Sequence, residues 1–217
     1  MKTPLPALVF PLLLAACGNT TGGFGPGFSA QAGVSGARVD VTIVRVYDKT
    51  TGEFKYSDTT YRLTQPSVTF TMLAGSVGGR VTGAQVTVND ASGNRYADVS
   101  GQYIQNFSAR LVQGYACPDA AGKAVPGSDP DTCAAASRIP VTRQQTFPEA
   151  NNNGSIQLLV PRIAEYAVQD CVDGPCPANL TMDVTFSVTD DLNRTQTVTV
   201  NKAPVVVFRV SDTRREE

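Results

Sequence analysis

The chain has 217 residues, with 18 Lys and Arg against 19 Asp and Glu, and it contains no His and no Trp. Without His there is no Ser-His-Asp or Cys-His catalysis, and no metal site or pH switch built on imidazole. A net charge of −1 argues against nucleic-acid binding, which requires a basic surface. The 26 Val and 23 Thr outnumber the 12 Leu. Because Val and Thr are enriched in strands, this composition predicts an all-β protein.

The N-terminus carries a targeting signal. Lys2 precedes an apolar run over residues 5–16, which is too short to span a bilayer as a helix and which ends in Leu-Ala-Ala-Cys17. This ending resembles the lipobox of bacterial lipoproteins, in which an aliphatic residue and two small residues precede the cysteine. The resemblance implies that residues 1–16 are a signal peptide and that Cys17 is lipidated and acylated. The alternative is an ordinary secretory signal in which the cysteine stands by chance.

The lipoprotein resemblance also implies a location. Several acyl chains would hold the exported protein firmly on a membrane of the cell envelope. Gly18 rather than Asp follows the cysteine, which favours the outer membrane if the organism is Gram-negative. The next stretch, residues 18–36, contains seven Gly and no charge. We therefore predict that residues 17–36 are a flexible tether, with a root-mean-square reach of about 24 Å.

Four further cysteines remain once Cys17 is lipidated. An even number in an exported protein indicates two disulfides. We favour Cys117 with Cys133 and Cys171 with Cys176, because each pair brackets one loop rich in Pro, Gly and Asp. A zinc site is the alternative, but the spacing lacks the paired CxxC typical of structural zinc.

Strand patterns follow from residue 37 onward. Apolar residues alternate with polar ones, which indicates strands with one buried and one solvated face. The runs are residues 39–43, 59–63, 68–72, 86–88, 103–111, 156–160, 182–188, 198–200 and 205–208. One short helix is predicted near residues 163–169.

Two hairpins, over residues 84–99 and 184–200, have turns rich in Asp, Gly and Asn. The second resembles the last hairpin of bacterial immunoglobulin-like and fibronectin-III-like domains. The resemblance implies an antiparallel immunoglobulin-like β-sandwich over residues 37–211. Two small sandwiches, over 37–115 and 137–211, are the alternative. Residues 212–217 are predicted to be a charged, frayed tail.

Candidate catalytic and metal-binding groups are few. The acidic pairs Asp129/Asp131 and Asp190/Asp191 both lie in predicted turns, where Asp caps the backbone with its own side chain. A calcium site would draw on Asp90, Asn94 and Asp98, but no D-x-D-x-D-G loop is present. The glycine-rich residues 75–79 lack the Lys-Ser/Thr of a phosphate loop. We therefore expect no catalytic residue, no cofactor and no metal.

These observations favour a non-enzymatic envelope lipoprotein with a structural role, or one that binds another envelope protein or a glycan. A small-ligand binder is one alternative, with residues 114–136 as a lid over a deep apolar pocket. A glycan hydrolase that uses only carboxylates is the other. For a binding protein, the longest irregular stretch, residues 114–136, is the first candidate surface, because function in sandwiches often lies on loops.

Overall fold

The computed structural model describes residues 27–97, 103–105, 108–147 and 156–217. The predicted signal peptide and Cys17 lie outside these residues. Strands make up 54% of the described residues, and α1 (Pro161–Asp173) is the only α-helix among them. The protein is therefore all-β, as its composition predicts, and the helix lies where one was expected. Within the described ranges, no helix is long and apolar enough to cross a membrane.

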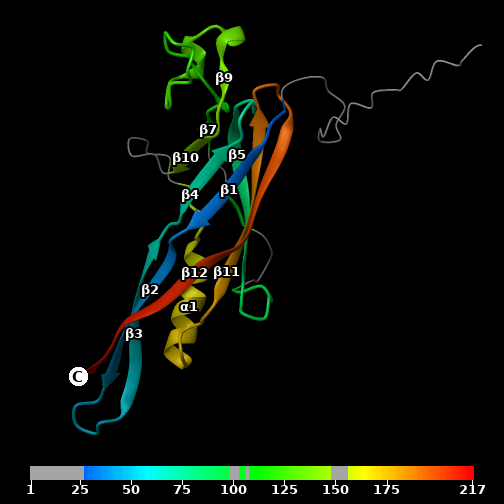
Figure 1. The fold of residues 1–217 in the computed structure, drawn as a ribbon. Helices are drawn as coiled ribbons and strands as arrows, with labels where there is room; N and C mark the ends of the chain where they lie inside the picture. The colour runs from blue at the N-terminus through cyan, green and yellow to red at the C-terminus, as the bar shows by residue number, and fades with distance from the viewer. Residues whose placement is uncertain (1–26, 98–102, 106–107, 148–155) are drawn as a thin grey trace, which may run out of the picture.

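Two sheets pack against each other as a β-sandwich (Figure 1). The smaller sheet is antiparallel and joins three strands in the order β1-β4-β10. The larger sheet has the order β3-β2-β12-β11-β5-β6, with β7 also paired to β5. It therefore combines strands from the first and the second half of the chain. The bounds in the smaller sheet are β1 Ala30–Ser35, β4 Ser67–Met72 and β10 Arg143–Phe147. In the larger sheet they are β2 Ala37–Tyr47, β3 Phe54–Thr64, β5 Gly79–Asn89, β6 Tyr103–Gln105, β7 Ala109–Leu111, β11 Leu180–Asp190 and β12 Thr195–Glu216.

The core of the sandwich follows from the alternation in the sequence. Along β11, every second residue from Leu180 to Asp190 is buried and the residues between are half-buried. Phe186 meets Phe70 of the opposite sheet edge-to-face, with ring centroids 5.0 Å apart, and Phe70 also contacts Phe147. Such edge-to-face pairs stabilise a core beyond the area that they bury.

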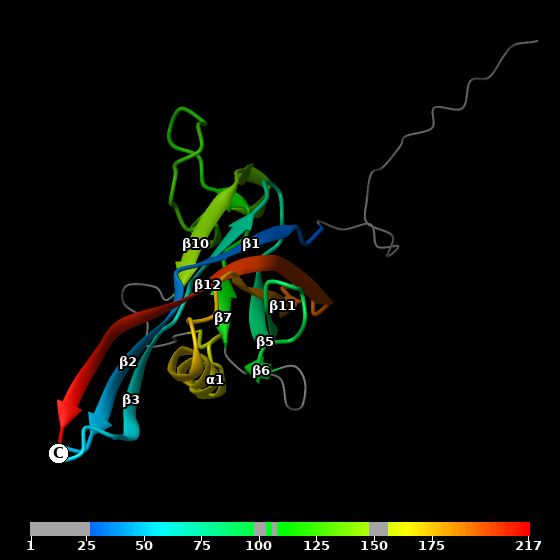
Figure 2. The same ribbon diagram turned by 90° about the horizontal axis from the view of Figure 1, so that it is seen from below.

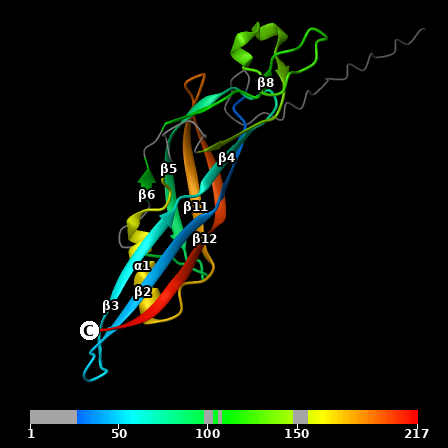
Figure 3. The ribbon, with the colours of Figure 1, turned by 90° about the vertical axis from the view of Figure 1, so that its left-hand side faces the viewer.

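Beyond the sandwich, three strands continue as a narrow extension, which we call the arm (residues 37–64 and 206–216). β12 makes this possible because it is long: its first half pairs with β11, and its second half runs parallel to β2, from Ala37 to Tyr47. β3 completes the arm as the outer strand (Figures 1 and 3). Helix α1 packs Ala164, Ala167 and Cys171 against one face of β2, on Val39, Val41 and Ile43. Figure 2 shows α1 beside the arm strands.

At the opposite end of the molecule from the arm, the chain between β7 and β10 forms a small irregular unit, residues 113–142, which we call the disulfide lobe (Figures 1 and 3). It contains β8 (Tyr115–Ala116) paired with β9 (Ile139–Pro140). It also contains two 3-10 helices, η1 (Pro130–Thr132) and η2 (Ala135–Ser137). The arm tip and the lobe thus form the two ends of an elongated molecule.

The strand predicted over residues 156–160 is wrong. Ile156 and Leu158 are buried as the alternation requires, but Leu159 between them is buried too, and no strand forms there. The side-chain amide of Gln65 replaces a neighbouring strand, because its oxygen accepts from the N–H groups of Leu158 and Leu159 and its nitrogen donates to the Leu159 carbonyl. Pro161 then begins α1. Residues 151–154, Asn-Asn-Asn-Gly, have the composition of a turn but lie outside the described residues.

Two predicted boundaries are also corrected. The predicted tether, residues 17–36, includes strand β1, which pairs with β4 along its whole length. The predicted tail, residues 212–217, belongs to β12 up to Glu216. Asp212 pairs with Arg45, the Tyr56 hydroxyl donates to Glu217, and the Arg214 guanidinium lies over the Tyr47 ring. The charged tail is ordered because β2 and β3 supply partners for its charges.

Candidate functional site

The disulfide lobe is the surface that the sequence put forward first. The structure joins Cys117 to Cys133 within it, with the two Cα atoms 5.8 Å apart. It joins Cys171 to Cys176 at the C-terminal end of α1, with a Cα separation of 4.2 Å. These are the pairs that the loop argument favours, and both separations lie close to the range that a disulfide allows.

The lobe is fixed to the sandwich through Gly114. The Gly114 N–H donates to the Ser76 carbonyl over 2.8 Å, and the Gly114 carbonyl accepts from Gly75 and Val141. A Cβ atom at this position would lie 2.0 Å from the Leu73 carbonyl oxygen. Only glycine allows the two backbones to approach this closely, so the base of the lobe is a rigid junction.

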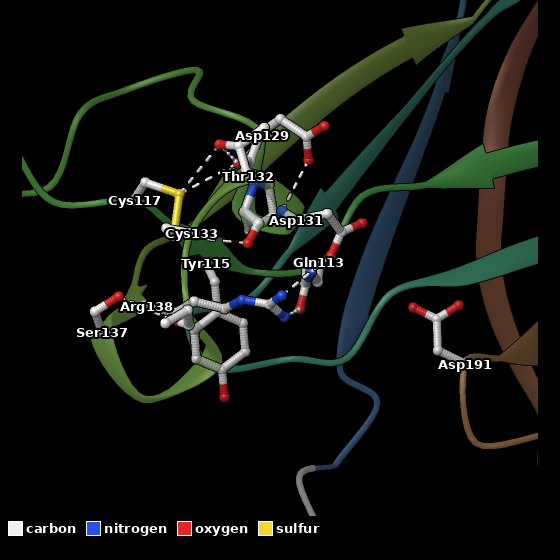
Figure 4. Close-up of polar contacts among 12 residues, drawn as sticks. Gln113, Tyr115, Cys117, Asp129, Asp131, Thr132, Cys133, Ser137, Arg138 and Asp191 are labelled. Atoms are coloured by element: carbon white, nitrogen blue, oxygen red, sulfur yellow. Dashed lines mark hydrogen bonds and ion pairs between the residues drawn. A yellow bond between two sulfur atoms is a disulfide. The ribbon is translucent and has the colours of Figure 1, made fainter.

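Hydrogen bonds and ion pairs between side chains connect the segments of the lobe (Figure 4). The Arg138 guanidinium donates to Gln113 over 3.1 Å and to Asp131 over 3.3 Å, while the Gln113 amide donates to the same carboxylate over 2.8 Å. Arg143 donates to the backbone carbonyls of Tyr115 and Ser128. The Arg143 contacts join residues 114–136 to β10, and the contacts of Arg138 and Gln113 hold the lobe together, so this segment is not arranged as an open lid.

A hollow of about 270 Å³ lies between the lobe and the sandwich. Its lining is mostly polar and contains charges of both signs: Arg110, Val112, Gln113, Gly127, Asp129, Asp131 and Arg143. Arg110 beside it is held in a two-pronged ion pair with Asp191. The small-ligand alternative requires a deep apolar pocket, and this hollow does not have that character.

In each of the two acidic pairs, one carboxylate accepts hydrogen bonds from backbone N–H groups of its own turn. Asp129 accepts from the Asp131 N–H as the cap of η1. The buried Asp190 carboxylate accepts from the backbone N–H groups of Leu192 and Arg194 and from the Arg194 side chain. Burial alone would raise the pKa of Asp190, but these hydrogen bonds outweigh it and lower the pKa below its ordinary value. In both pairs, one Asp caps a turn, as the sequence indicates.

The residues considered for calcium are not gathered into a site. Asp90 caps its own turn by accepting from the N–H groups of Ser92 and Asn94. Asp98 lies outside the described residues. Among the residues that the structure describes, no group of three metal-ligating side chains is found.

The arm carries exposed apolar side chains, on both of its faces, that the sequence did not lead us to expect. Eight large hydrophobic side chains of the described part are exposed, and six of them lie on the arm. These six are Phe54, Tyr56, Tyr61, Val206, Phe208 and Val210. Phe208 is 50% exposed and lies beneath the Arg38 guanidinium. The sequence signal was the unbroken run Val205-Val206-Val207-Phe208, which places apolar groups on both faces of one strand.

The described chain begins at the lobe end of the molecule. The Gly27 carbonyl accepts a hydrogen bond from the Val77 N–H. The Ser29 carbonyl accepts one from the Leu73 N–H, and the Ser29 N–H donates one to the Ser76 hydroxyl. This is the same turn that holds Gly114 of the lobe. The C-terminus lies at the other end, where the Glu217 carbonyl accepts from Lys49 in the turn between β2 and β3 (Figure 1).

Comparison with models of known protein families and with curated protein sequences finds no match to this chain.

Proposed function

We propose that the chain is a non-enzymatic lipoprotein of the cell envelope, anchored through Cys17, which holds its arm away from the membrane to bind another envelope component. The observation that carries this proposal is the position of the two ends. The chain enters the sandwich at Gly27 beside the disulfide lobe, and the arm tip lies at the far end. A lipid on Cys17 would therefore keep the lobe near the membrane and direct the arm outward.

The proposed tether is shorter than the sequence alone suggested, because β1 takes up its second half. Residues 17–26 would give a root-mean-square reach of about 17 Å. A lobe held this close to a membrane has little room for a large partner, whereas the arm tip is accessible. We therefore propose that the binding surface lies on the arm rather than on residues 114–136.

The binding partner in this proposal is a protein or a glycan of the envelope, and no cofactor or nucleic acid takes part. The arm offers aromatic and aliphatic side chains next to paired charges, as at Phe208 beneath Arg38, which bonds to Asp40. Apolar groups rimmed by polar ones are typical of interaction surfaces. We further propose that the sandwich is related to immunoglobulin-like domains, on the basis of the hairpin over residues 184–200.

The proposal is tested by recovering the intact protein from membranes together with its partners. Phe208→Ser should reduce the recovered partner at least tenfold. The matched control is Leu192→Ser, which removes a side chain of similar exposure, 48%, at the lobe end and should have no effect. Replacing residues 118–132 by a short Gly/Ser linker, with both cysteines kept, should also leave recovery unchanged. Loss of partner in the linker variant but not in Phe208→Ser would move the binding surface back to the lobe.

A further inference from the structure

The outer edge of β3 is a long, regular strand edge without a neighbour. β3 has 11 residues and pairs with β2 on one side only, and no other strand of the described part lies against it. Such an edge presents a row of free backbone N–H and C=O groups, which is a template for a further strand. Its charges, Lys55, Asp58 and Arg62, are too few to prevent pairing along its whole length.

Two of these charges make no close polar contact within the protomer. Asp58 and Arg62 are both exposed, and in the described residues neither makes an ion pair or a side-chain hydrogen bond. Asp58 is attracted to Arg215 of β12 only beyond ion-pair distance. Several other charges on the arm are paired, as in Arg45 with Asp212 and Lys55 with Asp48. Asp58 and Arg62 lie four residues apart on the same face of β3, because side chains alternate along a strand.

We propose that the edge of β3 pairs with the β3 edge of a second copy of this chain, antiparallel and about a two-fold axis at Thr60. In this register Thr60 faces itself, Asp58 of each copy faces Arg62 of the other, and Thr59 faces Tyr61. Opposite charges and an aromatic residue facing a β-branched one are both favourable cross-strand pairs. The two-fold axis makes each of these pairs twice.

The sequence of β3 selects this register over its neighbours. In a continuous sheet, residues directly opposite each other point to the same face. The two-fold axis must therefore pass through a residue, and the possible registers differ by which residue that is. Registers centred on Lys55, Asp58 or Arg62 place like charges opposite each other. Among the symmetric registers, only the one centred on Thr60 brings Asp58 opposite Arg62, and it pairs residues 56–64 of both copies.

Charge reversal tests the proposal in the full chain carrying Cys17→Ser, so that a lipid does not bring the copies together. The unmodified edge should give a dimer in analytical ultracentrifugation. Asp58→Arg and Arg62→Asp should each raise the dissociation constant at least tenfold, because each faces like charges twice. The double variant should restore the dimer, since it exchanges the two charges. All of these positions are exposed, so the fold should be kept, which circular dichroism checks.

A cross-link tests the register itself. Thr60→Cys should be joined to its copy by a short bismaleimide. Thr64→Cys is the matched control, because the two copies of residue 64 would lie about 27 Å apart, eight strand residues at 3.4 Å each. A monomer at all concentrations, dimers unaffected by the single charge reversals, or equal cross-linking at both positions would each overturn the proposal. In the monomeric case, the edge would be open to a strand of a different protein. None of these results depends on membrane anchoring or on Phe208.

Discussion

Single side chains decide local structure in this protein where a pattern of hydrophobicity does not. Residues 156–160 carry the alternation of a strand, yet the Gln65 amide satisfies their backbone groups and the chain goes directly into α1. Hydrophobic alternation predicts which residues are buried, and Ile156 and Leu158 are indeed in the core. It does not show whether a strand or a distant side chain will supply the hydrogen bonds.

Gln65→Ala should therefore destabilise the protein by about 2 kcal/mol, because three backbone groups of the segment before α1 lose their partners. Urea unfolding at neutral pH measures the change. Gln65→Glu is the informative control, since it keeps the accepting oxygen and loses the donor to the Leu159 carbonyl. It should be less stable than the parent protein, and a Gln65→Ala protein as stable as the parent would contradict this account of the segment.

Asp190→Asn should cost about 1–2 kcal/mol at pH 7, because a buried carboxylate gives up its charge-assisted bonds to Arg194. The folded-state pKa of Asp190 lies below its unfolded value. The ionised carboxylate therefore stabilises the folded state fully above the unfolded pKa, and this contribution is lost as the pH falls through the folded pKa. The difference in unfolding free energy between parent and variant should shrink in acid. A difference that is constant down to pH 2 would show that the charge of Asp190 is irrelevant.

At the scale of elements, the sequence predicts most strands. It does not predict that β12 pairs with β11 along its first half and with β2 along its second half. The apolar residues 205–208 indicate a strand, and the charged residues after them gave no sign that it continues. Arg45, Tyr47 and Tyr56, more than 150 positions earlier, provide the partners that extend it. Such long-range pairing is invisible to local patterns, so the arm as a whole could not be predicted.

Deleting residues 212–217 should therefore destabilise the arm locally. The second half of β2 would lose its neighbour on the β12 side and keep β3 on the other. Hydrogen–deuterium exchange should show lost protection at residues 43–47, because free strand edges exchange readily. Protection in β5 and β11 should be unchanged, which serves as the internal control. Unaltered exchange at residues 43–47 would mean that the end of β12 contributes nothing to the arm.

At the scale of the whole molecule, the two ends serve different purposes in the proposed function. The lobe is bonded at Gly114 to the turn that also holds Gly27, so a tether attached there would reach the membrane from that side. The cell-envelope location and the lipid anchor at Cys17 are expectations from the resemblance of the N-terminus to a lipobox. The direction of the arm follows from the fold alone, because no sequence pattern relates Gly27 to the turn between β2 and β3.

The most direct test of this account measures how far each end lies from a membrane. The lipidated protein is bound to vesicles that contain an acceptor dye, and a donor dye is placed either at Thr50→Cys in the arm-tip turn or at Lys123→Cys in the lobe. Both positions are exposed, and the four cysteines of the described part are in disulfides. We expect strong energy transfer from the lobe and weak transfer from the arm tip. Equal transfer, stronger transfer from the arm tip, or a Cys17→Ser protein that still binds the vesicles would contradict the central claim.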